Sequence, residues 1–162
     1  MSPLVLILDQ GGHSTRALVF DGAGALVAQA SQAINTVTRQ PGWIEQDAAD
    51  LVASLHAVLA QVANQLGVRC QHLSAAGLIV QRSSLVAWNR LSLQPLSPVL
   101  SWQDTRHSAW LDDILVGKRD VIRDKTGLYP NAHYGASKIR WLLDNVPAAK
   151  LAADNHALSI AP

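Results

Sequence analysis

The sequence predicts an α/β domain in which helices cover a sheet, and three observations lead to that prediction. Short apolar runs separated by glycine turns occupy the first 34 residues, which is typical of an antiparallel meander of strands. A long segment with helical spacing of its apolar residues comes next, and another apolar run follows it. From residue 104 onward the periodicity is mostly helical. This order of strands, helix, strand and helices is typical of a layered α/β domain.

The predicted strands are short and rich in branched side chains. Residues 4–8 are entirely apolar, which suits a strand buried on both faces. Residues 17–20 and 26–34 complete a three-stranded antiparallel meander with the first run. Residues 73–80 predict another buried strand, and residues 85–88 predict a further one.

The long helix that follows the meander has recognisable start and stop signals. Asp47 lies where an N-cap is expected, with Asp50 three residues later in the manner of a capping box. Apolar residues recur at helical spacing up to Leu66, and Gly67 lies where a glycine C-cap belongs. Shorter helices are expected near 104–116, 118–126 and 135–145, and residues 157–162 resemble a strand.

The composition excludes several classes of protein. The chain has 162 residues and a mass of 17.4 kDa, which is about one domain's worth of chain. Hydrophobic residues make up 49% and charged residues 15%, so a disordered chain is excluded. A net charge of +1 gives no electrostatic footprint for nucleic acid or for an anionic membrane. So apolar a chain either packs tightly or leaves a face for a partner.

Cysteine usage and the N-terminus indicate a cytoplasmic protein. Cys70 is the only cysteine, so no intramolecular disulfide can form and a reducing compartment is expected. The N-terminal segment lacks the basic region and the long apolar stretch of a signal peptide. No apolar run approaches the ~18 residues of a membrane span.

The first turn of the meander carries the most chemistry. Gly11 and Gly12 can adopt positive φ, which would let consecutive backbone N–H groups converge on an anion. Ser14 and Thr15 add hydroxyl donors, and Arg16 adds a planar cation that suits phosphate oxygens. The pattern is not a Walker A motif, because no Gly-Lys-Ser/Thr opens a helix here.

Asp9, at the carboxyl end of the first strand, could hold a hydrated Mg²⁺ through water. The alternative interpretation of this segment is structural, because Gly-Gly is also found in ordinary hairpin turns with solvated polar neighbours. Spacing alone leaves both interpretations open.

Four segments, taken together and in order, resemble the FGGY carbohydrate kinases, and within that family the glycerol kinases. They are residues 8–17, 20–21, 40–47 and 102–106. The resemblance extends from Leu4 to at least Asn145. It implies the actin-like ATPase fold, in which two ribonuclease H-like domains enclose a catalytic cleft. It also implies that this chain is a partial ribonuclease H-like domain.

The resemblance implies roles for particular residues, with ATP and Mg²⁺ as cofactors. The ATP phosphates would lie against Gly11, Gly12, His13, Ser14, Thr15 and Arg16, with Asp9 holding the metal through water. The substrate would lie against Gln81, Arg82, Ser83, Trp102 and Asp104, and against a position that falls at His133 or Tyr134. Asp104 and Arg106 also have a structural interpretation, as an acid at a helix start with its partner.

Two departures from the family pattern concern the ligands. Glycerol kinases carry a glutamate directly after the arginine that matches Arg82, whereas this chain has Ser83. A charged hydrogen bond to a polyol is worth about 1.5–3 kcal/mol, so its loss should change substrate recognition. Gly12 and His13 replace two threonines, which removes hydroxyl donors from the hairpin. A small polyol or sugar other than glycerol is therefore the expected substrate.

The resemblance implies that residues 1–162 form the N-terminal domain of an ATP-dependent carbohydrate kinase. The general base of the family lies downstream of the matched residues, as does the adenine-binding domain, so no catalytic residue is expected here. We therefore expect the chain to be inactive alone, with a second copy or a further C-terminal domain as partner. The alternative is a non-catalytic sugar-binding or regulatory module.

Overall fold

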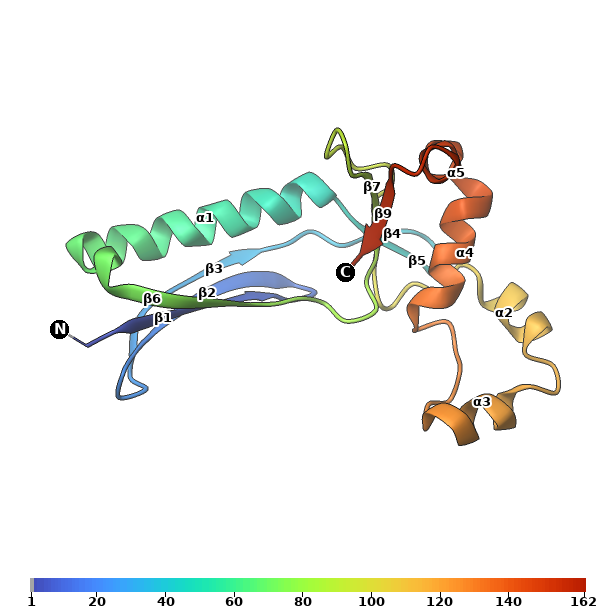
Figure 1. Ribbon diagram of the computed structural model, residues 1–162, viewed down its shortest axis with the longest axis horizontal. Coiled ribbons are helices and arrows are strands. Elements are labelled where there is room, and N and C mark those ends of the chain that lie inside the picture. Colours follow the sequence, from blue (N-terminus) through green and yellow to red (C-terminus); the bar gives the residue numbers. More distant parts are fainter. Residues whose placement is uncertain (1) are drawn as a thin grey trace. The chain divides into compact units, whose positions relative to one another are not determined.

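The computed structural model describes residues 2–162, which form two compact units (Figure 1). The first unit contains the residues up to Thr36 together with Gln46–Gln81, and the second contains Val37–Glu45 and Arg82–Pro162. Each unit has its own core, so the two are described in turn.

A four-stranded sheet forms the base of the first unit. Its strands are β1 (Leu4–Gln10), β2 (Ser14–Asp21), β3 (Leu26–Ala33) and β6 (Leu73–Ile79), in the order β3-β2-β1-β6. β1, β2 and β3 are antiparallel neighbours, as the sequence predicts, whereas β6 runs parallel to β1. In the β1–β2 register Asp9 lies opposite Arg16, which brings the charged ends of the two strands together.

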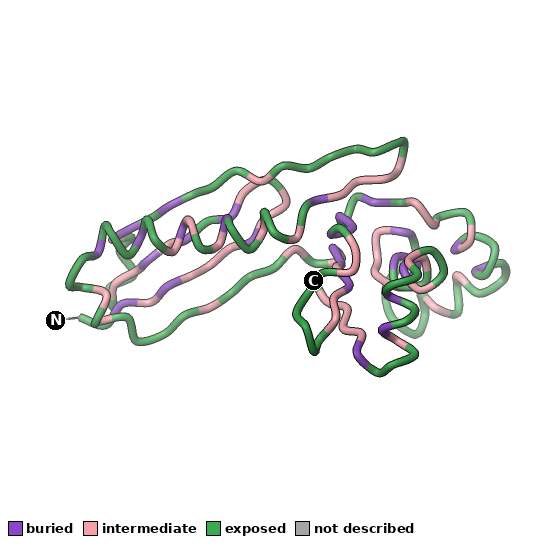
Figure 2. Tube along the Cα trace, turned by 90° about the horizontal axis from the view of Figure 1, so that it is seen from above, coloured by how far each residue is buried: buried purple, intermediate pink, exposed green. Residues whose placement is uncertain are grey.

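The helix α1 (Ala48–Leu66) covers one face of this sheet (Figure 2). Its predicted caps are confirmed, because the Asp47 carboxylate accepts the N–H of Ala49 at 2.7 Å and Gly67 ends the helix with a φ of 55°. A short 3₁₀ helix, η1 (Gly67–His72), leads into β6. The buried face of α1 meets alanines and branched side chains of the strands, namely Leu4, Leu6, Ala17, Val19, Ala28 and Ala30.

The combined helix Ala48–His72 is long and apolar enough to cross a membrane by length and composition. This measure is the mean hydropathy of a window that includes polar residues, so it differs from the unbroken apolar run considered in the sequence. Val58, Val62 and Leu66 lie in the core against the strands, however, and this is the packing of a core helix in a layered domain.

The second unit is built from short elements. They are β4 (Val37–Gln40), β5 (Trp43–Gln46), β7 (Val86–Asn89), β8 (Val99–Leu100), α2 (Ser108–Ile114), α3 (Arg119–Thr126), α4 (Gly135–Asn145), α5 (Pro147–Asp154) and β9 (Leu158–Ala161). β4, β5 and β8 form one small sheet, and β7 pairs antiparallel with β9. Its main core contains Ala87, Leu100, Leu142 and Ala149. Leu111, Leu115 and Ala132 form a separate cluster beside α3.

The structure corrects the prediction that residues 73–80 form a buried strand. β6 lies at the edge of its sheet, and Leu78 and Ile79 are each more than half exposed. An apolar run favours a strand, but it does not show whether other parts of the chain cover that strand. The sequence analysis also missed the β4–β5 hairpin, whose turn contains Gly42 at a φ of +80°, and the helix α5.

Candidate phosphate and substrate sites

The loop Gly11–His13 joins β1 to β2 and presents backbone donors at its tip. Gly11 N–H donates to the carbonyl of Ser14 at 3.0 Å, which closes the turn. Among residues 2–162 the N–H groups of Gly12 and His13 have no hydrogen-bond partner. Two adjacent unpaired amides at a loop tip are suitable donors for an anion. The predicted hairpin with backbone donors is thus present.

The reason for glycine in this loop differs from the predicted one. Neither Gly11 nor Gly12 is among the glycines with positive φ in the described chain. At Gly11 the constraint is close approach, because a Cβ there would lie 3.0 Å from the Ser14 carbonyl oxygen. A side chain at position 11 would therefore push the turn open.

Two glutamine amides anchor the hairpin through its carbonyl groups. Gln46 Nε2 donates to the Gly12 carbonyl at 2.8 Å and to Thr36 Oγ1 at 3.0 Å. Gln81 Nε2 donates to the Gly11 carbonyl at 2.9 Å and to Gln46 Oε1 at 3.0 Å. The Gly11 and Gly12 carbonyls share peptide planes with the Gly12 and His13 N–H groups. Because the carbonyls are held, these N–H groups are fixed in place and still free to donate. Gln81 thus supports the hairpin.

Thr15 does not point toward a ligand, which corrects its predicted role in phosphate binding. Its side chain is fully buried under α1, where Oγ1 accepts from Gln10 Nε2 at 2.8 Å. Thr15 Oγ1 also lies 2.5 Å from Ser54 Oγ, which in turn donates to the Leu51 carbonyl at 2.7 Å. Thr15 shares a strand face with Ala17, so the period of two already places it toward the core. The hydroxyl therefore links β2 to α1.

Asp9 and Arg16 form an ion pair across the β1–β2 ladder at the same end of the sheet as the hairpin loop. The Arg16 side chain is 54% exposed, so solvent screens the pair and it adds little to stability. His13 is also exposed, and Ser14 is partly exposed. Among residues 2–162 no three potential metal ligands cluster, so Asp9 is a single carboxylate here.

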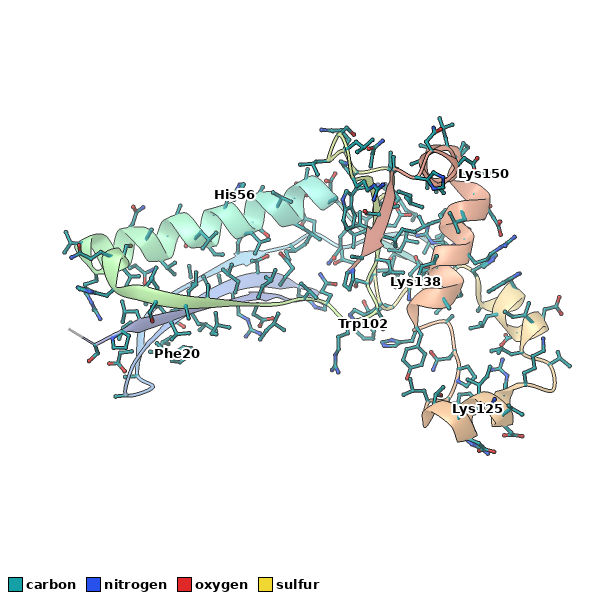
Figure 3. All side chains as sticks on the ribbon, in the orientation of Figure 1. Phe20, His56, Trp102, Lys125, Lys138 and Lys150 are labelled. Atoms are coloured by element: carbon teal, nitrogen blue, oxygen red, sulfur yellow. The ribbon has the colours of Figure 1, made fainter. Side chains whose placement is uncertain are left out.

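In the second unit, Trp102 and His133 form the aromatic part of the predicted substrate side. Trp102 follows β8 and is 38% exposed, and its backbone N–H donates to Ser84 Oγ at 3.0 Å (Figure 3). The His133 ring meets the Trp102 ring edge-on at a centroid distance of 5.5 Å. Tyr134 contacts His133 at 5.3 Å. His133 is therefore the member of the predicted pair that directly contacts Trp102.

Ser83 has a φ of 67°, which is uncommon for a residue with a Cβ. It lies between the exposed Arg82 and the buried Ser84, whose hydroxyl binds the Trp102 backbone. The left-handed turn thus places Arg82 and Ser83 directly beside a residue that is tied to Trp102. A strained backbone held by its surroundings is common at ligand sites.

Asp104 is a structural residue, which corrects its predicted contact with substrate. Its carboxylate is fully buried and accepts the Ile44 N–H at 2.7 Å. The same carboxylate accepts the Arg106 guanidinium through Nε at 2.9 and 3.0 Å and through Nη2 at 2.7 Å. With every oxygen occupied, Asp104 has no lone pair directed at a substrate. The expected pairing of Asp104 with Arg106 is present, but Asp104 lies before α2, whose first turn has no acidic residue, so it is not an acid at a helix start.

The Arg106 guanidinium occupies a closed site between two indole rings. It stacks over Trp43 at 4.2 Å and over Trp141 at 4.4 Å, and the two rings meet edge-on at 5.2 Å. Arg106 Nη2 also donates to Glu45 Oε1 at 2.8 Å. Because a desolvated guanidinium binds aromatic faces and carboxylates together, this residue joins β5, the loop after β8 and α4. Sequence analysis did not detect this cluster, since its members are distant in sequence.

Lys138, on α4, is a buried lysine that sequence analysis also missed. Its Nζ donates to the carbonyls of Ala132 and His133 at 3.1 and 2.7 Å. Burial lowers the pKa of Lys138 to about 8, while Asp104 raises it and Arg106 lowers it further. The sequence does contain a signal for its burial: Lys138 lies four residues before Leu142, and therefore on the same face of α4 as this buried leucine.

Residues 4–160 match the N-terminal domain of the FGGY family of carbohydrate kinases. The chain belongs to this family. Glycerol kinases are among its curated relatives: the protein from Deinococcus radiodurans is 35% identical over 155 residues, and that from Paracidovorax citrulli is 38% identical over 151 residues. These matches cover 96% and 93% of this chain but 31% and 30% of the relatives, so the chain spans about a third of their length.

Solved structures show the same fold. The glycerol kinase of Plasmodium falciparum, crystallised with ADP, superposes with a TM-score of 0.87 at 24% identity, covering 99% of this chain and 32% of that one. The xylulose kinase of Rhodospirillum rubrum gives a TM-score of 0.82 at 23% identity, over 90% of this chain and 30% of its own. The predicted actin-like ATPase fold is therefore confirmed.

We predict that replacing Arg106 with methionine destabilises the chain by about 3–5 kcal/mol, because the fully buried Asp104 carboxylate would lose its paired charge and Glu45 would keep only Arg39. Arg140→Met is the matched control, since Arg140 pairs with Asp144 on the exposed face of α4 and its loss should cost under about 1 kcal/mol. Urea denaturation measures both free energies of unfolding. Equal losses in the two variants would contradict the central role of Arg106.

A second prediction concerns the pH dependence of stability. Lys138 has a pKa of about 8 in the folded chain, against about 10.4 when unfolded, so the unfolded chain binds more protons between these values. The contribution of Lys138 to stability should therefore increase as the pH rises from about 8 to 10. We expect the free energy of unfolding of wild type relative to Lys138→Met to increase by about 2 kcal/mol over this range. A pH-independent difference would show that the lysine titrates normally.

Proposed function

We propose that this chain provides the phosphate-binding hairpin and the substrate-binding residues of an ATP-dependent kinase that phosphorylates a small sugar or polyol. The observation that carries the proposal is the hairpin Gly11–His13, whose two free amides lie at the same sheet end as the half-exposed Arg16. Membership of a family of carbohydrate kinases supports the same reaction class.

The hairpin residues fit the phosphates of ATP. The N–H groups of Gly12 and His13 would donate to phosphate oxygens, and Arg16 would add a charged planar donor. Asp9 would bind a hydrated Mg²⁺ through water, because its carboxylate is already shared with Arg16 and is one acid alone. When bound, the metal neutralises charge on the transferred phosphoryl group.

The second unit fits a small hydroxylated substrate. Trp102 offers an apolar surface for a carbon skeleton, while Arg82, Ser83 and His133 offer hydrogen-bonding groups around it. Ser83 supplies a hydroxyl where the glycerol kinases carry a carboxylate, which supports a substrate other than glycerol. Solved proteins of the same fold include a xylulose kinase and a gluconate kinase.

We propose that the chain binds ligands without turning them over. The carboxylate nearest to Trp102 in sequence, Asp104, is held by Arg106 and Ile44 and cannot take a proton from a substrate hydroxyl. In the first unit Asp9 is paired with Arg16. Both groups are thus occupied, so neither Asp104 nor Asp9 is free to act as a general base. A non-catalytic sugar-binding module remains the alternative.

Titration calorimetry with Mg²⁺–ATP tests the phosphate assignment. We expect Arg16→Ala to weaken binding by about tenfold, which corresponds to the lower end of the energy of a charged hydrogen bond. Arg90→Ala is the control, because Arg90 is an exposed arginine of the second unit. A coupled assay with glycerol, erythritol and xylulose should show no turnover by the chain alone. Equal binding by both variants would refute the phosphate site, and robust turnover would refute the absence of a base.

The replacement Ser83→Glu tests the substrate side. A carboxylate beside Arg82 and Trp102 would accept hydrogen bonds from a polyol, so affinity for glycerol should rise by about tenfold. Ser108→Glu places the same charge on an exposed residue of α2 and should leave glycerol binding unchanged. Saturation-transfer NMR titrations measure both affinities. No change in Ser83→Glu would place substrate specificity in other residues.

A further inference from the structure

The carbonyls of Ala132 and His133 are both held by one buried ammonium group. Lys138 Nζ lies 3.1 Å from the Ala132 oxygen and 2.7 Å from the His133 oxygen, and only 1% of the lysine is exposed. Lys138 lies in the first turn of α4, six residues after Ala132 and five after His133, both of which precede the helix. The side chain therefore reaches back along the helix and fixes the backbone immediately before it.

The backbone that Lys138 holds is also the backbone that presents His133. The remaining bonds of this segment are local, since His133 N–H donates to Asn131 Oδ1 at 2.9 Å and Tyr134 N–H lies 3.4 Å from the Asn131 carbonyl. Asn131 is itself exposed, so these bonds compete with water. The Ala132 side chain packs against Leu111 and Leu115, and Lys138 supplies the hydrogen bonds that tie the backbone of the segment to α4. The His133 ring lies against Trp102.

A lysine is an expensive residue for this position if packing is its only purpose. Asp104, which attracts the ammonium, is bound to Arg106, so Lys138 has no carboxylate of its own. An apolar side chain of similar length would avoid the burial of a charge. What such a side chain could not do is bind two consecutive carbonyls, which is the contact that orients His133.

We propose that Lys138 is a positioning residue, which holds the Ala132–His133 backbone so that the His133 imidazole faces a substrate lying on Trp102 (Figure 3). The part that concerns the substrate rests on the proposed function. The part that concerns the contact between the His133 and Trp102 rings does not. The ring contact and the substrate binding can therefore be tested separately.

The test compares three variants of the 162-residue chain by NMR. In wild type, nuclear Overhauser contacts should connect the Trp102 indole to the His133 imidazole. Lys138→Met should abolish these contacts and speed amide exchange at His133 by at least tenfold. Lys138→Gln keeps a donor and should retain part of the contact. Lys150→Met, an exposed lysine on α5, is the control and should match wild type.

A binding measurement separates positioning from general stability. Affinities for glycerol, xylulose and gluconate should fall about tenfold in Lys138→Met, and the affinity for Mg²⁺–ATP should stay unchanged, since the hairpin belongs to the other unit. A parallel loss of both affinities would indicate a merely structural lysine and overturn the proposal, as would intact ring contacts in Lys138→Met. If Lys138→Met does not fold, the Lys138→Gln spectra decide. If wild type binds none of the three compounds, the proposed function fails while the ring contact still tests the lysine.

Discussion

The second unit depends on the burial of one guanidinium group, that of Arg106. It neutralises Asp104 and Glu45 and fills the space between Trp43 and Trp141. A buried ion pair is weak evidence for net stability, because desolvation opposes the attraction. Its effect here is geometric. The second unit has short strands and helices and a small apolar core, and the Arg106 contacts fix β5, α4 and the loop after β8 to one another. Trp102 lies in the same loop as Asp104 and Arg106, just before them in the chain.

Both units position groups of their candidate sites by the same means, which is to hold backbone carbonyl oxygens with buried or partly buried side chains. In the first unit, Gln46 and Gln81 hold the Gly12 and Gly11 carbonyls, so the free amides of the loop stay fixed. In the second unit, Lys138 holds the backbone of His133. A loop fixed through its acceptors keeps its donors and side chains available, and fixed groups lose less entropy when a ligand binds.

The sheet of the first unit is covered on one face but has an exposed apolar edge. α1 covers one face of the four-stranded sheet, whereas β6 leaves Leu78 and Ile79 at an exposed edge. Exposed apolar edges favour association with another strand or chain. The chain spans about a third of the relatives that it matches, so a covering element in a longer protein and a second copy are both consistent with this edge.

The sequence by itself determined the meander, the caps of α1 and the position of the β1–β2 hairpin, because strand period, capping residues and glycine turns are local signals. It also determined the family, through short motifs kept in order. Only the tertiary structure decided that Thr15 and Asp104 are buried, that Gln81 holds the hairpin and that His133 contacts Trp102. The residue type alone does not show whether a polar side chain near a motif binds a ligand or is buried in the core. The choice depends on distant partners: Ser54 is 39 residues from Thr15, and Ile44 is 60 residues from Asp104. These partners become neighbours of Thr15 and Asp104 only after folding.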